Sequence, residues 1–270
     1  MLTFRELKAG LTQPLSGQSY LYLRDLLREL VARDMKLRYR DSVLGWAWSL
    51  LNPLAQLLVF GFVFRFVLPL NIPNYTSFLF IGLLAWSWFQ ASLMGAATVI
   101  VDGRALIRRP GFPALILPLV SVVANMVHFL LALPIVFLFL WFTGVSLQLP
   151  VILLPLLVLL QAFFTLSIAY FLATFHVSFR DTQHLVGVGL LLFFYLTPIF
   201  YDTGTIPDRF LFVYRLNPVL HLLEGYRDVL LYGVWPSWGG LAAVTAVTAV
   251  FLLVGINLFQ NASYRFVEEL

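Results

Sequence analysis

Long apolar stretches without charge dominate this chain. A helix that crosses a membrane needs about 20 mostly apolar residues, so intervals that lack Asp, Glu, Lys and Arg mark the candidate spans. The interval Pro110–Phe179 would form a helix on the order of 105 Å long, so it must fold back, and Thr143–Pro150 is the polar, turn-forming stretch near its middle. The pattern predicts an all-α integral membrane protein with six spans, at Val43–Phe64, Thr76–Val101, Phe112–Phe142, Val151–His176, Leu185–Tyr201 and Trp238–Phe259.

The segment before the first span predicts an amphipathic helix. Within Leu21–Arg40, apolar residues recur at three- and four-residue intervals with charged residues between them. This spacing places the apolar side chains on one face of a helix and the charges on the other. Such a helix fits the cytoplasmic interface of the membrane. It is either a surface anchor without a partner or a docking surface for a cytoplasmic subunit.

A long segment before the last span has a different pattern. Asp202–Pro236 contains two apolar runs, Phe210–Leu216 and Val219–Tyr232, which are too short to cross a membrane. Asn217 and Pro218 lie at the break between them, a combination typical of a turn. We therefore expect a re-entrant helical hairpin at the outer side, with Asn217 and Pro218 at its turn.

Three charged residues on the second run, Glu224, Arg227 and Asp228, are three and four residues apart and therefore share one helix face. We expect them to pair with one another as a structural brace. The alternative is that they contact a substrate. Together with the turn residues they form the candidate outer gate.

Composition agrees with lipid as the main solvent. Of the 270 residues, 61% are hydrophobic and 11% are charged, and the mean hydropathy is +0.90; a soluble domain has about 45–50% apolar and about 25% charged residues. The net charge of +4 is explained by topology rather than by a nucleic-acid partner, because most Lys and Arg residues fall on one side of the predicted spans.

The positive-inside rule places that side, with both termini, in the cytoplasm, which requires an even number of spans. The chain then divides into a cytoplasmic N-terminus with the amphipathic helix (1–42), a six-span domain (43–259) that includes the hairpin at about 202–236, and a cytoplasmic tail (260–270).

The sequence lacks the common signatures of enzymes. Neither of its two lysines, Lys8 and Lys36, follows a glycine, so a phosphate-binding P-loop is missing. There is no cysteine, no zinc-protease motif and no serine-hydrolase motif. We expect no catalytic residue, no metal site and no cofactor bound by this chain. A transport role would therefore need energy from another chain.

Force from such a chain would enter through cytoplasmic elements. Besides the amphipathic helix, these are the short basic loop Asp102–Gly111 and the loop at Phe179–Asp181, although either loop could instead serve topology alone. The candidate coupling residues are Arg28, Arg33, Arg38, Arg40, Arg104, Arg108, Arg109, Arg180 and Asp181.

Aromatic residues are abundant near the predicted span ends. They fit an aromatic belt at the membrane interface. The alternative is that some of them line a conduit, where aromatic faces would stack against the C–H faces of sugar rings. The candidates for that role are Trp46, Trp48, Trp86, Trp88, Tyr195 and Tyr201.

Three blocks of sequence resemble one family, the membrane subunits of ATP-binding-cassette exporters for lipid-linked polysaccharides, which include O-antigen and wall teichoic acid permeases. Arg28–Leu54 is similar to the family's interface helix and first span, with Leu44-Gly45-Trp46 and Asn52-Pro53. Val177–Tyr201 carries the Phe-Arg-Asp loop and the Thr-Pro-Ile near the end of span five, and Leu216–Gly233 resembles the re-entrant hairpin.

The resemblance implies a homodimer in the cytoplasmic (inner) membrane of a bacterium or archaeon, together with two copies of a separate cytoplasmic ATPase that binds ATP and Mg. It further implies a conduit at the dimer interface, a lipid-linked glycan as substrate, and hairpins that gate the outer end. Two other functions remain open at this point: a permease for a small molecule or drug, and a membrane enzyme or lipid scramblase that needs no ATPase.

Overall fold

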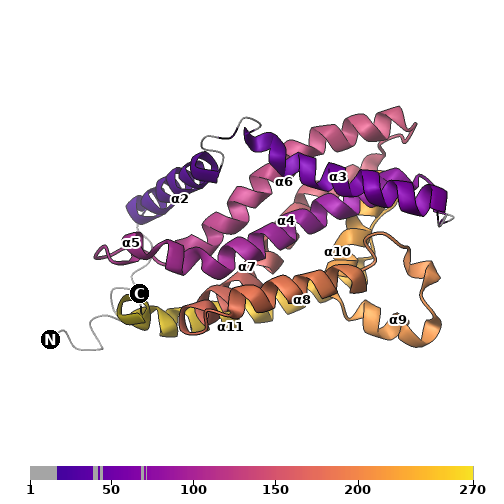
Figure 1. Ribbon diagram of the computed structural model, residues 1–270. Coiled ribbons are helices and arrows are strands. Elements are labelled where there is room, and N and C mark those ends of the chain that lie inside the picture. Colours follow the sequence, from indigo (N-terminus) through magenta and orange to yellow (C-terminus); the bar gives the residue numbers. More distant parts are fainter. Residues whose placement is uncertain (1–16, 39–41, 43–44, 68–69, 71, 270) are drawn as a thin grey trace.

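The computed structural model describes residues 17–38, 42, 45–67, 70 and 72–269. Over these residues the chain is almost entirely helical, as the sequence predicts (Figure 1). The α-helices are α2 (Gly17–Arg38), α3 (Trp48–Phe62), α4 (Tyr75–Asp102), α5 (Arg104–Ile107), α6 (Ile116–Phe142), α7 (Leu154–Ser178), α8 (Thr182–Leu196), α9 (Asp208–Arg215), α10 (Pro218–Arg227) and α11 (Trp238–Glu269). Short 3-10 turns η1 (Gly45–Ala47), η3 (Leu149–Leu153) and η4 (Thr203–Thr205) and π-turns η2 (Val63–Val67) and η5 (Asp228–Tyr232) continue or connect them.

Within the described residues, five helical segments are long and apolar enough to cross a membrane. They are Leu50–Val67, Tyr75–Asp102, Ile116–Phe142, Leu149–Ser178 and Trp238–Phe266. Helix α8 corresponds to the predicted fifth span but has only 15 residues, about 22 Å of helix. An irregular stretch up to Tyr201 follows it, so the count of six spans stays a prediction.

Helix α4 is the centre of the bundle. It packs against α6 and α7 over much of its length and also contacts α3, α8 and α10. Its span is 72% buried inside the chain, whereas the span formed by α3 and η2 is only 17% buried. Helix α11 packs along α7 on the opposite side. Helix α3 therefore lies at the edge of the bundle, with one face uncovered.

The amphipathic helix is confirmed as α2, which packs against α6. Leu30 is buried, and Leu26, Leu27 and Val31 pack beside it against the core, while most of the charged side chains, such as Arg28 and Arg33, are exposed. In Figure 1, α2, α5 and the C-terminal end of α11 lie at one end of the molecule, and α9 lies at the other.

The predicted break at Asn217 and Pro218 separates α9 from α10. The Asn217 side chain accepts a hydrogen bond from the backbone N–H of Val219 (2.9 Å), and Pro218 fills the first helical position, where no N–H is needed. The two helices differ in environment: no α9 residue is buried, whereas most of α10 is enclosed by α4, α7 and α11.

The first predicted span begins later than expected. Its helix α3 starts at Trp48, after the 3-10 turn Gly45–Ala47, rather than at Val43, which lies outside the described residues. Gly45 adopts a left-handed backbone conformation with φ of 50°, a conformation favourable to glycine. The predicted start of the span depended on the absence of charge, and that pattern does not predict the turn at Gly45–Ala47.

Candidate functional site

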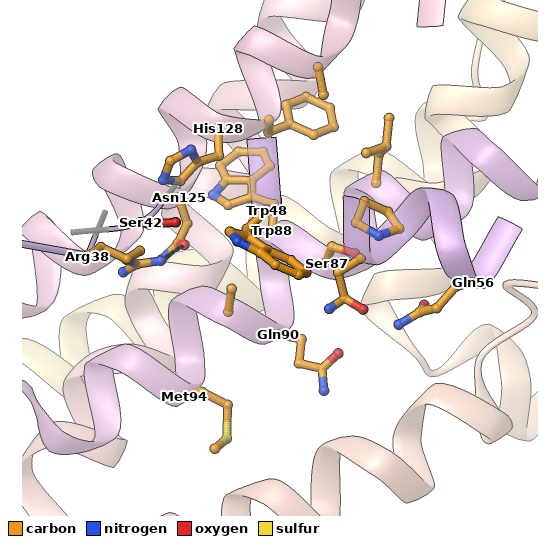
Figure 2. Close-up of a pocket in the computed structure, with 16 residues that line it drawn as sticks. Arg38, Ser42, Trp48, Gln56, Ser87, Trp88, Gln90, Met94, Asn125 and His128 are labelled. Carbon is orange, nitrogen blue, oxygen red and sulfur yellow. Dashed lines mark hydrogen bonds between the residues drawn. The ribbon is translucent and has the colours of Figure 1, made fainter. Parts of the chain in front are cut away.

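A cavity of about 570 Å³ lies between the end of α2 and helices α3, α4 and α6 (Figure 2). It opens to the surface of the bundle beside α3. Its lining residues are Arg38, Ser42, Trp48, Asn52, Pro53, Gln56, Leu84, Ser87, Trp88, Gln90, Ala91, Met94, Asn125, His128, Phe129 and Ala132.

Two indole rings form part of the cavity wall. Trp88 is held in place, because its ring stacks on Phe129 with 5.0 Å between centroids and its Nε1–H donates to the carbonyl of Val122 (3.3 Å). Trp48, by contrast, is 55% exposed. The cavity thus combines one fixed indole with one that is open to a ligand.

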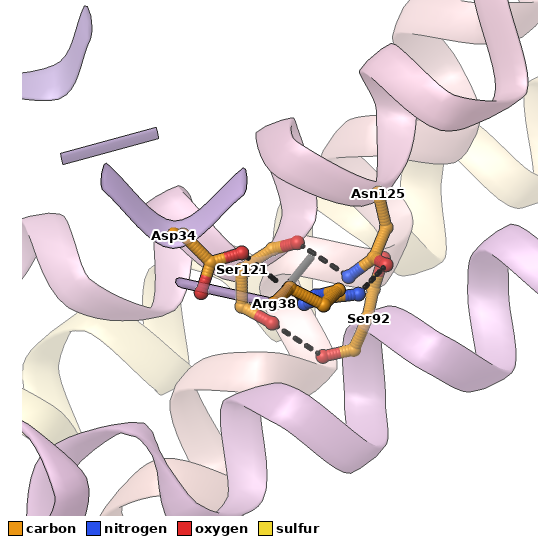
Figure 3. A network of polar contacts seen from close by, with 5 residues as sticks. All are labelled: Asp34, Arg38, Ser92, Ser121 and Asn125. Carbon is orange, nitrogen blue, oxygen red and sulfur yellow. Dashed lines mark hydrogen bonds and ion pairs between the residues drawn. The ribbon is translucent and has the colours of Figure 1, made fainter. Parts of the chain in front are cut away.

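A chain of hydrogen bonds fixes the end of the cavity nearest α2 (Figure 3). Arg38 donates from Nη1 to Asn125 Oδ1 (2.8 Å) and from Nη2 to Asp34 Oδ2 (3.2 Å). Asn125 donates in turn to the carbonyl of Ser121 (2.8 Å), and the Ser121 hydroxyl donates to the carbonyl of Ser92 (3.0 Å). This chain joins α2, α6 and α4.

Apart from His128, the remaining polar residues of the lining carry amide or hydroxyl groups. Asn52, Gln56, Ser87 and Gln90 place amide and hydroxyl groups within helices that otherwise carry apolar side chains. Amides both donate and accept hydrogen bonds, and indole faces pack against C–H groups. The wall is therefore suited to a ligand that presents hydroxyl groups on an otherwise compact ring.

The aromatic candidates occupy different environments. Trp48 and Trp88 line the cavity. Trp86 does not: it is 1% exposed, donates to Gln90 Oε1 (3.0 Å) and packs in the core, so in this conformation it lines no conduit. Tyr195 is exposed, and its carbonyl accepts a hydrogen bond from the Tyr201 hydroxyl (3.2 Å) at the C-terminal end of α8. The Trp46 side chain lies outside the description.

Most coupling candidates lie on the surface at the end of the molecule that carries α2 and α5. The side chains in this group are exposed: Arg28, Arg33, Arg104, Arg108, Arg109, Arg180 and Asp181. Arg40 lies outside the described residues. Arg38 differs from the expectation, because its guanidinium binds Asn125 and lines the cavity. The structure thus gives Arg38 a role in docking α2 on α6.

The predicted mutual pairing of Glu224, Arg227 and Asp228 is wrong. The carboxylate of Glu224 lies 3.9 Å from His221 Nδ1, and the Arg227 guanidinium donates to the carbonyls of Pro198 and Ile199. The Arg227 side chain points inward, because it follows the buried face of α10 toward α4. Spacing on one helix allowed the three groups to meet, but burial of that helix separated them.

Glu224 instead faces a second cavity of about 520 Å³ at the end of the molecule that carries α9, between η4, α9 and α10. Its carboxylate accepts a hydrogen bond from the Thr203 hydroxyl (3.3 Å), and its other oxygen lies 3.9 Å from His221 Nδ1. Partial burial, with a smaller contribution from Glu224, raises the pKa of Asp228 to about 6. In the described part of the chain, no cluster of His, Asp and Glu residues could hold a metal ion.

The sequence pattern missed the neutral polar residues of the first cavity, Asn52, Gln56, Gln90 and Asn125 above all. The absence of charge marks a span, and these residues are uncharged like the apolar residues around them. Their signal was the position of amides inside apolar helices, where polar groups are costly to place and usually functional.

Comparison with known proteins gives consistent matches. Residues 25–231 match the family model described as ABC-2 type transporter. An O-antigen export system permease protein, RfbA, from Myxococcus xanthus is 39% identical over 249 residues, which cover 92% of this chain and 96% of the relative. RfbA of Klebsiella pneumoniae is 32% identical over 250 residues with the same coverage. The polysialic acid transport protein KpsM of Escherichia coli is 21% identical over 86% of this chain and 91% of its own length.

Proposed function

This chain belongs to the ABC-2 type transporter family, and from that premise we propose that it is the permease subunit of an ATP-driven exporter of a lipid-linked polysaccharide. The observation that carries the proposal is the 39% identity to an O-antigen export permease, which extends over 92% of the chain. The chain is the transport subunit in the membrane, and we assign ATP hydrolysis, with bound ATP and Mg, to a separate cytoplasmic partner.

The cavity between α2, α3, α4 and α6 supports a glycan as the transported group. Its indoles and neutral amides match the alternating C–H faces and hydroxyl groups of a sugar chain. A drug-like substrate would favour a more uniformly apolar wall. The cavity lies beside α3, the least covered span, so a second copy of the chain placed against α3 would enclose it. We therefore propose a homodimer that acts together with two copies of the ATPase.

The orientation follows from the charges. The exposed arginines of α2, α5 and the loop at 180–181 lie at the same end as the last turns of α11 (Figure 1). We assign this end to the cytoplasm of the cell that carries the exporter, with both termini inside, and α9 to the outer face of the cytoplasmic membrane.

We predict that the purified chain alone hydrolyses no ATP and that its complex with the partner ATPase does. The readout is phosphate release by the reconstituted complex in liposomes, with and without a lipid-linked glycan. We expect the glycan to stimulate ATP hydrolysis. We also expect the glycan to appear on the side of the liposome membrane opposite to the ATPase. ATP hydrolysis by the chain without a partner would contradict the proposal. Glycan movement that needs no ATP would also contradict it and would support a scramblase.

A second prediction concerns the coupling surface. In this cysteine-free chain, Ala105→Cys on the exposed face of α5 is expected to cross-link to the ATPase with a short bifunctional thiol–amine reagent. Ser146→Cys, which is equally exposed in the loop between α6 and η3, is the matched control and should not cross-link. Equal cross-linking at both positions, or none at Ala105→Cys, would remove α5 from the coupling surface.

A further inference from the structure

The irregular stretch that follows α8 is held by side chains from two other helices. Arg227 of α10 donates from Nη1 to the carbonyl of Pro198 (2.9 Å) and from Nη2 to the carbonyl of Ile199 (2.7 Å). Tyr75 of α4 donates to the carbonyl of Phe200 (2.9 Å). Three successive carbonyls, which have no helical partner, are thereby satisfied, as irregular backbone within a membrane protein requires.

A fourth contact lies at the start of the same stretch. Asn217 Nδ2, at the turn between α9 and α10, donates to Thr197 Oγ1 (3.0 Å). Residues 197–200 therefore contact α10 at both of its ends. Each of these contacts is a directional hydrogen bond, which fixes the relative position of its two partners more closely than apolar packing does.

The surroundings of Arg227 leave little room for other positions of its side chain. The residue is 3% exposed, and its guanidinium carbon lies 3.5 Å from the centroid of the Phe78 ring. Gly82 of α4 lies against it: a Cβ at that position would be 2.8 Å from Arg227 Nη2 and 3.2 Å from the Ile199 carbonyl oxygen. The positive charge is balanced by carbonyl dipoles and by a ring face.

Helix α3 and the π-turn η2 that continues it meet the same stretch through ring stacking. The rings of Phe60 and Phe64 lie 5.7 Å and 5.4 Å from that of Phe200, with interplanar angles of 3° and 15°. Ring stacking includes no hydrogen bond, so it fixes the position of its partners less closely than the hydrogen bonds to α4 and α10 do. The end of α8 is thus tied to α4 and α10 by hydrogen bonds, and it borders α3 and η2 through apolar ring contacts.

We propose that Arg227 is a positioning residue that joins α10, residues 197–200 and the outer half of α4 into one rigid unit, the outer unit, which stays intact during polysaccharide export. The proposal rests on the function proposed above. The hairpin then does not swing out alone. Opening at the outer end occurs where the outer unit borders α3.

A disulfide across the contact between Thr197 and Asn217 tests this directly. The pair Thr197→Cys and Asn217→Cys would be the only cysteines in the chain, and the complex with the partner ATPase is oxidised and compared with its own reduced form. A tie that is compatible with every state of the cycle shifts no equilibrium, so export by the oxidised complex should stay within about twofold of the reduced complex. Each single cysteine variant, oxidised in the same way, is the matched control.

Two outcomes of this experiment would overturn the proposal. One is a larger loss of export on oxidation that a reductant restores, since the contact must then open in the cycle. The other is a pair that gives neither a disulfide nor a cross-link with a short bismaleimide reagent in the resting complex, since the contact would then not exist in the membrane.

Substitution of Arg227 separates positioning from general stability. Arg227→Met should reduce export about tenfold or more, because two charge-assisted hydrogen bonds are lost, while ATPase association is retained. Arg227→Lys should lose less than Arg227→Met but stay below the parent, since an ammonium group cannot reproduce the planar fork. The disulfide between positions 197 and 217, introduced into Arg227→Met, should restore part of the export. No recovery with that disulfide formed would contradict the positioning role.

Export by the unmodified complex is measured in the same preparation. This control distinguishes failure of the proposed function from failure of the positioning role of Arg227. If the parent complex moves no glycan, the proposed function fails. Formation of the disulfide between positions 197 and 217, followed by electrophoresis with and without reductant, still reports whether the contact is closed.

Discussion

Gly82→Val is expected to prevent assembly of a stable bundle. The new side chain would stand within 2.8 Å of Arg227 Nη2 and 3.2 Å of the Ile199 carbonyl oxygen. Overpacking of this kind costs about 1–3 kcal/mol, and displacement of Arg227 from its carbonyl partners adds about 1.5–3 kcal/mol for a charged group. The sum is a large part of the total stability of a typical fold, about 5–15 kcal/mol.

The measurement is the yield of monodisperse protein in detergent and its thermal unfolding midpoint. Gly61→Val is the matched control, because Gly61 lies in the predicted first span and has no neighbour within 4 Å of an added Cβ. If the two variants unfold at the same temperature, the close packing of α4 against Arg227 is not what the structure indicates.

Asn125→Leu is expected to release α2 from α6. The amide of Asn125 is buried and accepts the hydrogen bond from Arg38 that joins the two helices. A hydrogen bond to a charged group contributes about 1.5–3 kcal/mol, so its loss should raise the open population of α2 by about ten- to hundredfold. Leu30→Cys, on the buried face of α2, should then react correspondingly faster with a maleimide.

Asn257→Leu provides the control for this comparison. Asn257 is exposed and donates to the carbonyl of Leu253 on its own helix. Its substitution therefore removes the same amide group from the chain at a site away from α2. Equal maleimide rates at Leu30→Cys in the two backgrounds would show that Asn125 does not hold α2.

The sequence predicted the helices well because each depends on a local pattern. The apolar runs gave the long spans, the three- and four-residue spacing gave α2, and the pair Asn217-Pro218 gave the turn between α9 and α10. These features depend on neighbours in the chain, and a single sequence contains them. The short length of α8 was less evident, because Leu185–Tyr201 is apolar beyond the residue at which the helix ends.

The candidate sites were harder to predict because they depend on contacts between distant segments. Arg227 was expected to bind Glu224 on its own helix, but it reaches carbonyls 28 and 29 residues away. Arg38 was expected to face the cytoplasm, but it binds Asn125, 87 residues away. In both cases the sequence allowed several partners for the arginine, and tertiary packing determined which of them it binds.

The enclosure of α10 also orders events during synthesis. Helix α10 packs against α4 and α7, which precede it, and against α11, which follows it. The ribosome synthesises α10 before the 32 residues of α11. The apolar face of α10 therefore stays uncovered by α11 for on the order of a few seconds. A nascent chain that stops before Trp238 would leave that face uncovered, a state that membrane quality-control proteases can recognise. Emergence of the final helix therefore completes the fold.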